Sequence, residues 1–158
     1  MEKKFETVAV GGTFDEFHKG HRALLKKAFE VGNRVFIGVT SDDLVKKWGK
    51  PHKVATYEKR LDDLKSFLRR QGVLDRAEIL TLHDEYGVTV SSSSLEGLVV
   101  SRETEARAYE INEKRKTKGL KPLKIIIVET VLAEDNVSIS TTRIRRKEVD
   151  REGRLLKT

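Results

Sequence analysis

The stretch GGTFDEFHKGH, residues 11–21, directly follows the apolar run VAV of residues 8–10. A short apolar run predicts a buried strand, and two glycines at its end let the backbone turn and approach a ligand. Residues 19–31 then carry apolar side chains at helical spacing, and Gly32-Asn33 is a helix stop. Because a helix N-terminus attracts anions through its free N–H groups and its dipole, this stretch predicts an anion site at the end of the first strand.

The alternation of strand and helix continues along the chain. We expect further strands over residues 34–39, 77–82, 98–100 and 123–128, and further helices from 41, over 56–71, over 103–118 and from 138. Residues 46–53 and 83–94 are expected to form loops. The strands are continuous apolar runs, which is typical of a parallel sheet covered on both faces. The sequence therefore predicts one Rossmann-like α/β domain over residues 1–158, with a five-stranded parallel sheet, helices on both faces and a ligand site at the carboxyl ends of the strands.

Composition narrows the function classes. Charged residues make up 36% of the chain, cysteine is absent, and the net charge is +7. No window approaches the roughly 18 apolar residues of a membrane span, and the first residues do not form a signal peptide, so we expect a cytoplasmic protein without membrane association. A basic chain suits an anionic partner, but only 6% of residues are aromatic and no groove-reading motif is present, which disfavours nucleic acid. No extra interface element is seen, which favours a monomer that binds small molecules.

The two histidines of the opening stretch allow three interpretations. His18 and His21 are three residues apart, so they share one face of a helical turn. A metal pair would need a third ligand, which the motif lacks, and the chain has no cysteine. A structural role would place His18 at a helix cap and His21 in a helix face. A phosphate site is favoured by the glycines, the helix start and the imidazole donors together.

A second motif, ISTTRIRR, occupies residues 139–146. Ser140 is a good N-cap, with two threonines in the first turn of the helix. Arg143 and Arg145 follow at once, and basic side chains there oppose the helix dipole. A bound polyphosphate would remove that conflict, because it accepts from hydroxyls, backbone N–H groups and guanidinium together. The alternative is an ordinary basic surface helix.

Together, GGTFDxxHxGH and ISTTxxR resemble the two signatures of the nucleotidyltransferase α/β phosphodiesterase superfamily. Residues 99–123 further resemble the VSxET…INxxRxxxGLxPL segment of the archaeal and eukaryotic phosphopantetheine adenylyltransferases. The matching positions are Val100, Ser101, Glu103, Thr104, Asn112, Arg115, Gly119, Leu120 and Pro122. The resemblance thus covers nearly the whole chain, although Ser101-Arg102-Glu103-Thr104 stands where the bacterial enzymes carry Arg-Gly-Leu-Arg.

The resemblance implies transfer of AMP from ATP to 4′-phosphopantetheine, which gives dephospho-coenzyme A and pyrophosphate in coenzyme A biosynthesis. It implies catalytic roles for His21 at the α-phosphate, for His18 and for a lysine of the KKWGKP loop, taken as Lys47. The expected ATP-binding residues are Gly12, Thr13, Phe14, His18, His21, Ser101, Arg102, Thr104, Ser140, Thr141, Thr142, Arg143 and Arg145. The expected acceptor-binding residues are Thr13, Asp15, Lys46 and Lys50. Mg²⁺ would arrive with ATP rather than in a protein site.

Two related activities share the first motif. Cytidylyltransferases for glycerol phosphate or phosphocholine usually show Arg-Thr-Glu-Gly before ISTT, where this chain has DNVS at residues 135–138. An archaeal-type FMN adenylyltransferase fits both end motifs but does not explain the match over residues 99–123. A nucleic-acid-binding module is the alternative from a different class.

Overall fold

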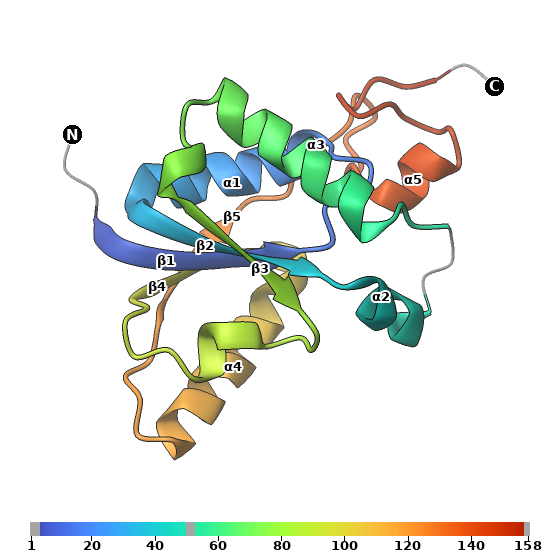
Figure 1. The fold of residues 1–158 in the computed structure, drawn as a ribbon. Coiled ribbons are helices and arrows are strands. Elements are labelled where there is room, and N and C mark those ends of the chain that lie inside the picture. The colour runs from blue at the N-terminus through green and yellow to red at the C-terminus, as the bar shows by residue number, and fades with distance from the viewer. Residues whose placement is uncertain (1–3, 50–52, 157–158) are drawn as a thin grey trace.

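The computed structural model describes residues 4–49 and 53–156, which form one α/β domain (Figure 1). The strands are β1 (Phe5–Gly12), β2 (Gly32–Thr40), β3 (Ala77–Leu82), β4 (Gly97–Ser101) and β5 (Lys124–Val128). The α-helices are α1 (Lys19–Val31), α2 (Asp42–Trp48), α3 (Tyr57–Arg70), α4 (Glu105–Thr117) and α5 (Thr141–Arg145). Short 3₁₀ helices are η1 (Leu74–Arg76), η2 (Gly87–Val90) and η3 (Arg102–Thr104).

The five strands form one parallel sheet in the order β3-β2-β1-β4-β5. The chain therefore moves outward from β1 to β3 on one side and crosses back to β4 on the other side. The carboxyl ends of β1 and β4 lie next to each other at this reversal, which is where open α/β sheets bind ligands. The predicted fold class is confirmed.

Helices cover both faces of the sheet, as Figure 1 shows for α1 and α3 on one side and α4 on the other. Successive residues of a strand point to opposite faces, and β1 follows this rule. Val8 and Val10 join a core cluster with Leu25 of α1 and Leu64 of α3. Ala9 joins a second cluster on the other face, built with side chains of β4 and α4.

The structure differs from the sequence-based expectation in the segments that follow β1 and β2. β1 continues through Gly12, and the turn after it is made by Phe14 and Glu16, which have positive φ angles of 57° and 54°. The segment expected as a loop from residue 46 is instead the last turn of α2, which ends at Gly49 in a left-handed conformation. Ser41 caps the start of this helix by accepting from Leu44 N.

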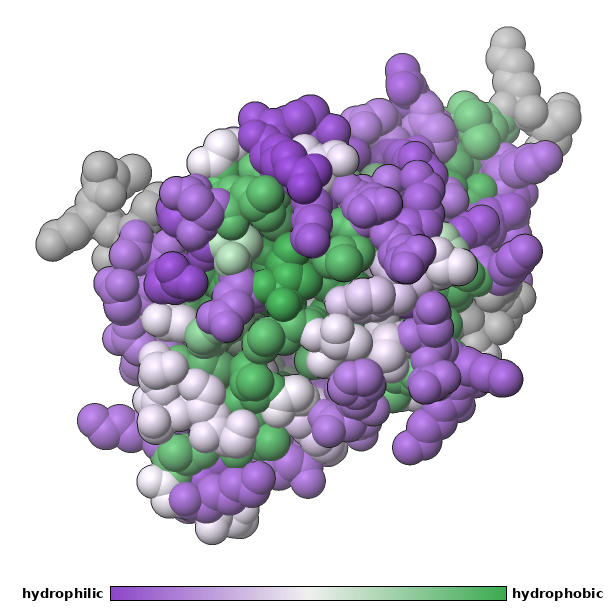
Figure 2. Space-filling model, in the orientation of Figure 1, coloured by the Kyte–Doolittle hydropathy of each residue, from purple (hydrophilic) through white to green (hydrophobic). Residues whose placement is uncertain are grey.

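Within the described residues, no helix has the length and apolar character needed to cross a bilayer. Figure 2 shows a band of hydrophobic side chains across the middle of the face on which the edge strand β3 lies. Leu80 and Leu82 of β3 and Val88 of η2 belong to the lining of the cleft described next.

Candidate active site

A cleft of about 520 Å³ lies at the carboxyl ends of the strands. Its walls come from the segment after β1, the start of α1, the end of α2, β3 and η2, the segment after β4, and the residues after β5 up to α5. The expected ATP-binding residues that line it are Gly12, Thr13, Phe14, His18, His21, Ser101, Thr104, Ser140, Thr141 and Thr142. The fold thus brings both sequence motifs, which are about 120 residues apart, to the same cavity.

The two histidines form the start of α1 together. His18 is the N-cap, and its Nδ1 accepts from Gly20 N at 3.0 Å. His21 Nδ1 accepts from His18 N at 3.1 Å, so each ring satisfies one backbone N–H of the first turn. The rings stack with centroids 3.7 Å apart. A Cβ on Gly20 would lie 2.8 Å from the His18 ring, which explains the glycine between the histidines.

These hydrogen bonds also fix where each imidazole carries its proton. A neutral imidazole whose Nδ1 accepts a hydrogen bond carries its proton on Nε2. Burial is the main cause that lowers the pKa of His18 to about 4, with a smaller lowering by Arg22 that is partly opposed by Asp15. Burial, followed by the neighbouring His18 and Arg22, holds the pKa of His21 well below its usual value. Both rings are therefore neutral Nε2–H donors at neutral pH rather than imidazolium ions.

The lowered histidine pKa values predict a pH dependence of stability. The unfolded chain binds protons at these histidines below about pH 6.5, whereas folded His18 binds one only near pH 4. The free energy of unfolding should therefore fall as the pH drops from about 6.5 to about 4, by about 3 kcal/mol from His18 alone. Urea unfolding at pH 7, 5.5 and 4.5 would measure this loss.

The matched variant is His18→Asn, since asparagine is a favoured N-cap and does not titrate. Its loss of stability across the same pH range should be smaller than that of the wild type. Equal pH dependence in the two proteins would contradict the assigned neutral state of His18.

The segment between β1 and α1 is held by aromatic packing. Phe14 is fully buried, and its ring meets the His21 ring edge-on at 5.4 Å between centroids. The Phe17 ring lies 5.7 Å from the His21 ring. His21 is thus enclosed by two aromatic side chains, which orient the imidazole and contribute to the burial that keeps it neutral.

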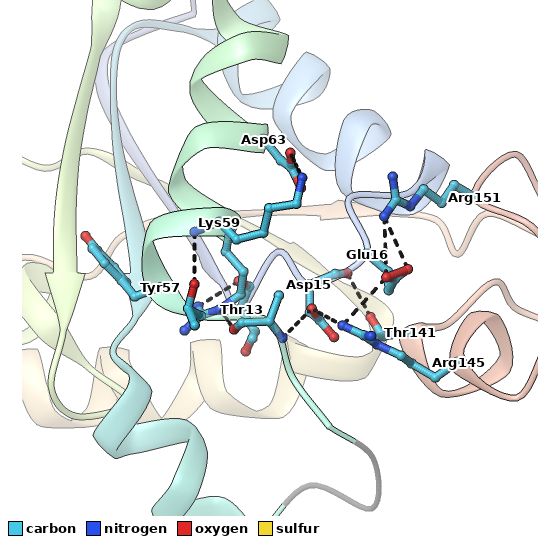
Figure 3. A network of polar contacts seen from close by, with 12 residues as sticks. Thr13, Asp15, Glu16, Tyr57, Lys59, Asp63, Thr141, Arg145 and Arg151 are labelled. Carbon is cyan, nitrogen blue, oxygen red and sulfur yellow. Dashed lines mark hydrogen bonds and ion pairs between the residues drawn. The ribbon is translucent and has the colours of Figure 1, made fainter.

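The second motif is tied to the first by a buried ion pair (Figure 3). Asp15 is 2% exposed, and its Oδ1 accepts from Arg145 at 3.0 Å and from Ala55 N at 3.0 Å. Thr141 donates to the main-chain oxygen of Asp15 at 3.1 Å. Glu16 takes ion pairs from Arg145 and Arg151. The carboxylates of the first loop therefore hold α5 and the C-terminal segment against the start of α1.

Arg60 of α3 is a buried residue of the site that sequence reasoning missed. It is 1% exposed and donates to the carbonyl oxygens of Thr13 at 3.0 Å, Thr40 at 2.7 Å and Ala55 at 2.9 Å. It also pairs with Asp42 at 2.9 Å. A single guanidinium thus fixes the ends of two strands and the segment before α3. The available signal was its position four residues before Leu64, which places both on one helix face.

Several expected site residues do not line the cleft. Arg102 is exposed and pairs with Glu105 and Glu129. Arg143 donates to Asp135, Glu148 and two main-chain carbonyls. These arginines therefore stabilise the surrounding loops in this structure. Ser140 does cap α5 as expected, by accepting from Arg143 N at 3.2 Å.

The three candidate lysines lie outside the cleft lining or outside the described part. Lys46 and Lys47 are exposed in the last turn of α2 and do not line the main cleft. Lys46 instead borders a smaller hollow beside residues 54–56. Lys50 lies outside the described residues.

Comparison with known proteins gives the class of this fold and site. Residues 9–147 match the family model described as cytidylyltransferase-like. A phosphopantetheine adenylyltransferase of Methanothermobacter thermautotrophicus is 45% identical, over 99% of this chain and 93% of the relative. That of Pyrococcus furiosus is 42% identical, over 95% and 93%. The chain belongs to the cytidylyltransferase-like family and, within it, to the phosphopantetheine adenylyltransferase family, so the predicted resemblance is confirmed.

Solved structures agree on the fold. A crystal structure of a protein of unknown function from Archaeoglobus fulgidus is 35% identical, with a TM-score of 0.70 over 77% of this chain and 88% of that chain. A bifunctional NMN adenylyltransferase/ADP ribose pyrophosphatase from Francisella tularensis has a TM-score of 0.59 at 19% identity, over 92% of this chain and 42% of that one, which shows the shared fold alone.

Proposed function

We propose that this chain transfers AMP from ATP to 4′-phosphopantetheine and releases pyrophosphate, which forms dephospho-coenzyme A. The observation that carries the proposal is the pair of neutral histidines at the start of α1, whose Nδ1 atoms are taken by backbone N–H groups. The remaining Nε2–H donors belong to residues that line the cleft. The names of the relatives support adenylyl transfer as the chemistry and phosphopantetheine as the acceptor.

The reaction is an in-line displacement at the α-phosphorus of ATP. An oxygen of the acceptor phosphate forms the new P–O bond while the bond to the β-phosphate oxygen breaks, and pyrophosphate leaves with that electron pair. We assign His21 to the α-phosphate oxygens, where charge develops, and His18 to the adjacent phosphates. Because each Nδ1 accepts a backbone hydrogen bond, the neutral ring carries its donor on Nε2, and no change of protonation state is needed before it binds phosphate.

The hydroxyl-rich wall of the cleft suits the remaining phosphates. We assign Ser140, Thr141 and Thr142 to the triphosphate and Thr13 to the acceptor phosphate. The Thr13 side chain already accepts from Thr40 at 3.0 Å, and Arg60 holds its carbonyl oxygen, so the residue is fixed before substrate arrives. Such fixed groups favour the reacting geometry because less order must be gained on binding.

The donor set of the protein supports a metal ion that is carried by the substrate. Among residues 4–49 and 53–156, no group of three or more His, Asp or Glu side chains could hold a metal ion. The buried carboxylate of Asp15 is already bound to Arg145. We therefore propose Mg²⁺ as part of the MgATP substrate, coordinated by phosphates and water.

The first experiment is pyrophosphate release with Mg²⁺, comparing ATP and CTP as donors. The acceptors are 4′-phosphopantetheine, FMN and glycerol 3-phosphate, and CTP is included because the family model is described as cytidylyltransferase-like. We expect release only with ATP and 4′-phosphopantetheine. Release with another pair would support nucleotidyl transfer with a different donor or acceptor. No release with any pair would reject nucleotidyl transfer.

A further inference from the structure

The charges that line the cleft are mostly negative. Four cleft-lining residues carry carboxylates, namely Asp15, Glu85, Glu103 and Glu129. Both histidines are neutral, so they add no positive charge. Within the described parts of the chain, Arg107 of α4 is the only lysine or arginine in the cleft lining. A cavity that must hold several phosphate groups thus has one guanidinium in its wall.

The donors of Arg107 are also unused. Its guanidinium contacts the Trp48 ring of α2 at 6.0 Å, and it forms no hydrogen bond or ion pair with residues 4–49 or 53–156. By contrast, Arg60, Arg102, Arg143 and Arg145 all donate to carboxylates or carbonyl oxygens. A contact with an aromatic face leaves the N–H edge of a guanidinium available for an anion.

Arg107 lies near the start of α4, which borders the cleft. Helical side chains lean toward the helix N-terminus, and α4 begins directly after the segment that follows β4. Arg107, the third residue of α4, lines the same cleft as Ser101 at the end of β4 and Thr104 of η3. Trp48 faces it from α2, which follows β2, so the pair spans two walls of the cleft.

We propose that Arg107 binds a phosphate group of a substrate in this cleft. The identity of that substrate rests on the proposed function: the group is either the triphosphate of ATP or the phosphate of the acceptor. A planar guanidinium can donate two parallel hydrogen bonds to phosphate. The Trp48 ring lies 6.0 Å from the guanidinium carbon, and this contact restricts the side chain before substrate binds, which reduces the order that binding must create.

The test compares Arg107→Ala, Arg107→Lys and Lys116→Ala. Lys116 is exposed on the same helix and does not line the cleft, so its variant removes the same charge without removing the proposed contact. We expect Arg107→Ala to raise the KM for one substrate about tenfold or more. A rise for ATP identifies the triphosphate, and a rise for the acceptor identifies its phosphate.

The two remaining variants separate a specific contact from general charge. Arg107→Lys should recover only part of the loss, because an ammonium cannot form the paired hydrogen bonds. Lys116→Ala should stay within about twofold of the wild type, as expected for an exposed surface change. Unchanged KM values in Arg107→Ala, or an equal change in Lys116→Ala, would overturn the proposal.

A binding measurement tests the role of Arg107 independently of the proposed reaction. Wild type and Arg107→Ala are titrated with MgATP, 4′-phosphopantetheine and inorganic pyrophosphate, and the affinities are measured by calorimetry. Trp48 is the only tryptophan in the chain, so its fluorescence in the same titrations reports on its contact with Arg107. A wild type without turnover would reject the proposed function, whereas equal affinities of the two proteins for all three phosphates would reject the role of Arg107.

Discussion

Replacing His21 by asparagine is expected to lower kcat by about two to three orders of magnitude while ATP affinity changes little. The imidazole uses its two nitrogens for different tasks. Nδ1 accepts from His18 N and completes the first turn of α1, and Nε2–H is the donor that we assign to the α-phosphate. The oxygen of asparagine can take over the Nδ1 position but offers nothing at Nε2.

His21→Gln is the matched variant. The longer amide can place an N–H near the Nε2 position, although it loses the acceptor for His18 N. We therefore expect His21→Gln to keep more turnover than His21→Asn while being less stable. Turnover and ATP affinity would be measured together with thermal unfolding, because only a contact strengthened in the transition state separates kcat from binding.

A parallel loss of turnover, ATP affinity and stability would contradict the catalytic role of His21. If His21→Asn lost stability and ATP affinity in proportion to turnover, His21 would be a structural residue of the α1 start. Its enclosure by Phe14 and Phe17 makes this a real alternative, since the same packing would serve a purely structural imidazole.

The strands and most helices could be predicted because their signals are local. The apolar run after Phe5, the helical spacing over residues 19–31 and the cap at Ser140 each lie within a few residues. The pairing of the two sequence motifs in one cleft also followed, since both come after parallel strands whose carboxyl ends share an edge.

The charge partners could not be predicted, because they depend on tertiary contacts. Arg143 and Arg145 oppose the dipole of α5, and from the sequence a polyphosphate was the expected compensation. In the structure Asp135 neutralises Arg143, and Asp15, 130 residues away in sequence, neutralises Arg145. The left-handed Phe14 gives no local signal, since only glycine and asparagine favour that conformation strongly.

The partners of Arg60 could not be predicted from the sequence either. Arginine is almost never fully buried unless it is paired, so its residue type predicts a surface position. Its acceptors are carbonyl oxygens that become available only where β1 and β2 end side by side. The position for a buried cation is created by the fold, so no local sequence pattern predicts it.

Replacing Arg60 by methionine should therefore lower the free energy of unfolding by about 3 kcal/mol or more. Methionine fills a similar space, but the carbonyl oxygens of Thr13, Thr40 and Ala55 would lose a buried donor. Their main-chain segments would then shift or admit water. Since Thr13 is the proposed ligand of the acceptor phosphate, the KM for 4′-phosphopantetheine should rise in the variant protein that remains folded.

Asp42→Asn separates these carbonyl contacts from the ion pair. The Asp42 side chain is 59% exposed, and an asparagine oxygen can still accept from Arg60 and from Tyr57 N. Loss of this exposed charge should cost less than about 1 kcal/mol. Urea unfolding and acceptor KM, both measured well below the melting temperature of each variant, would compare the two proteins. A small effect of Arg60→Met, or an equal effect of Asp42→Asn, would mean that the carbonyl contacts of Arg60 do not position the loop after β1.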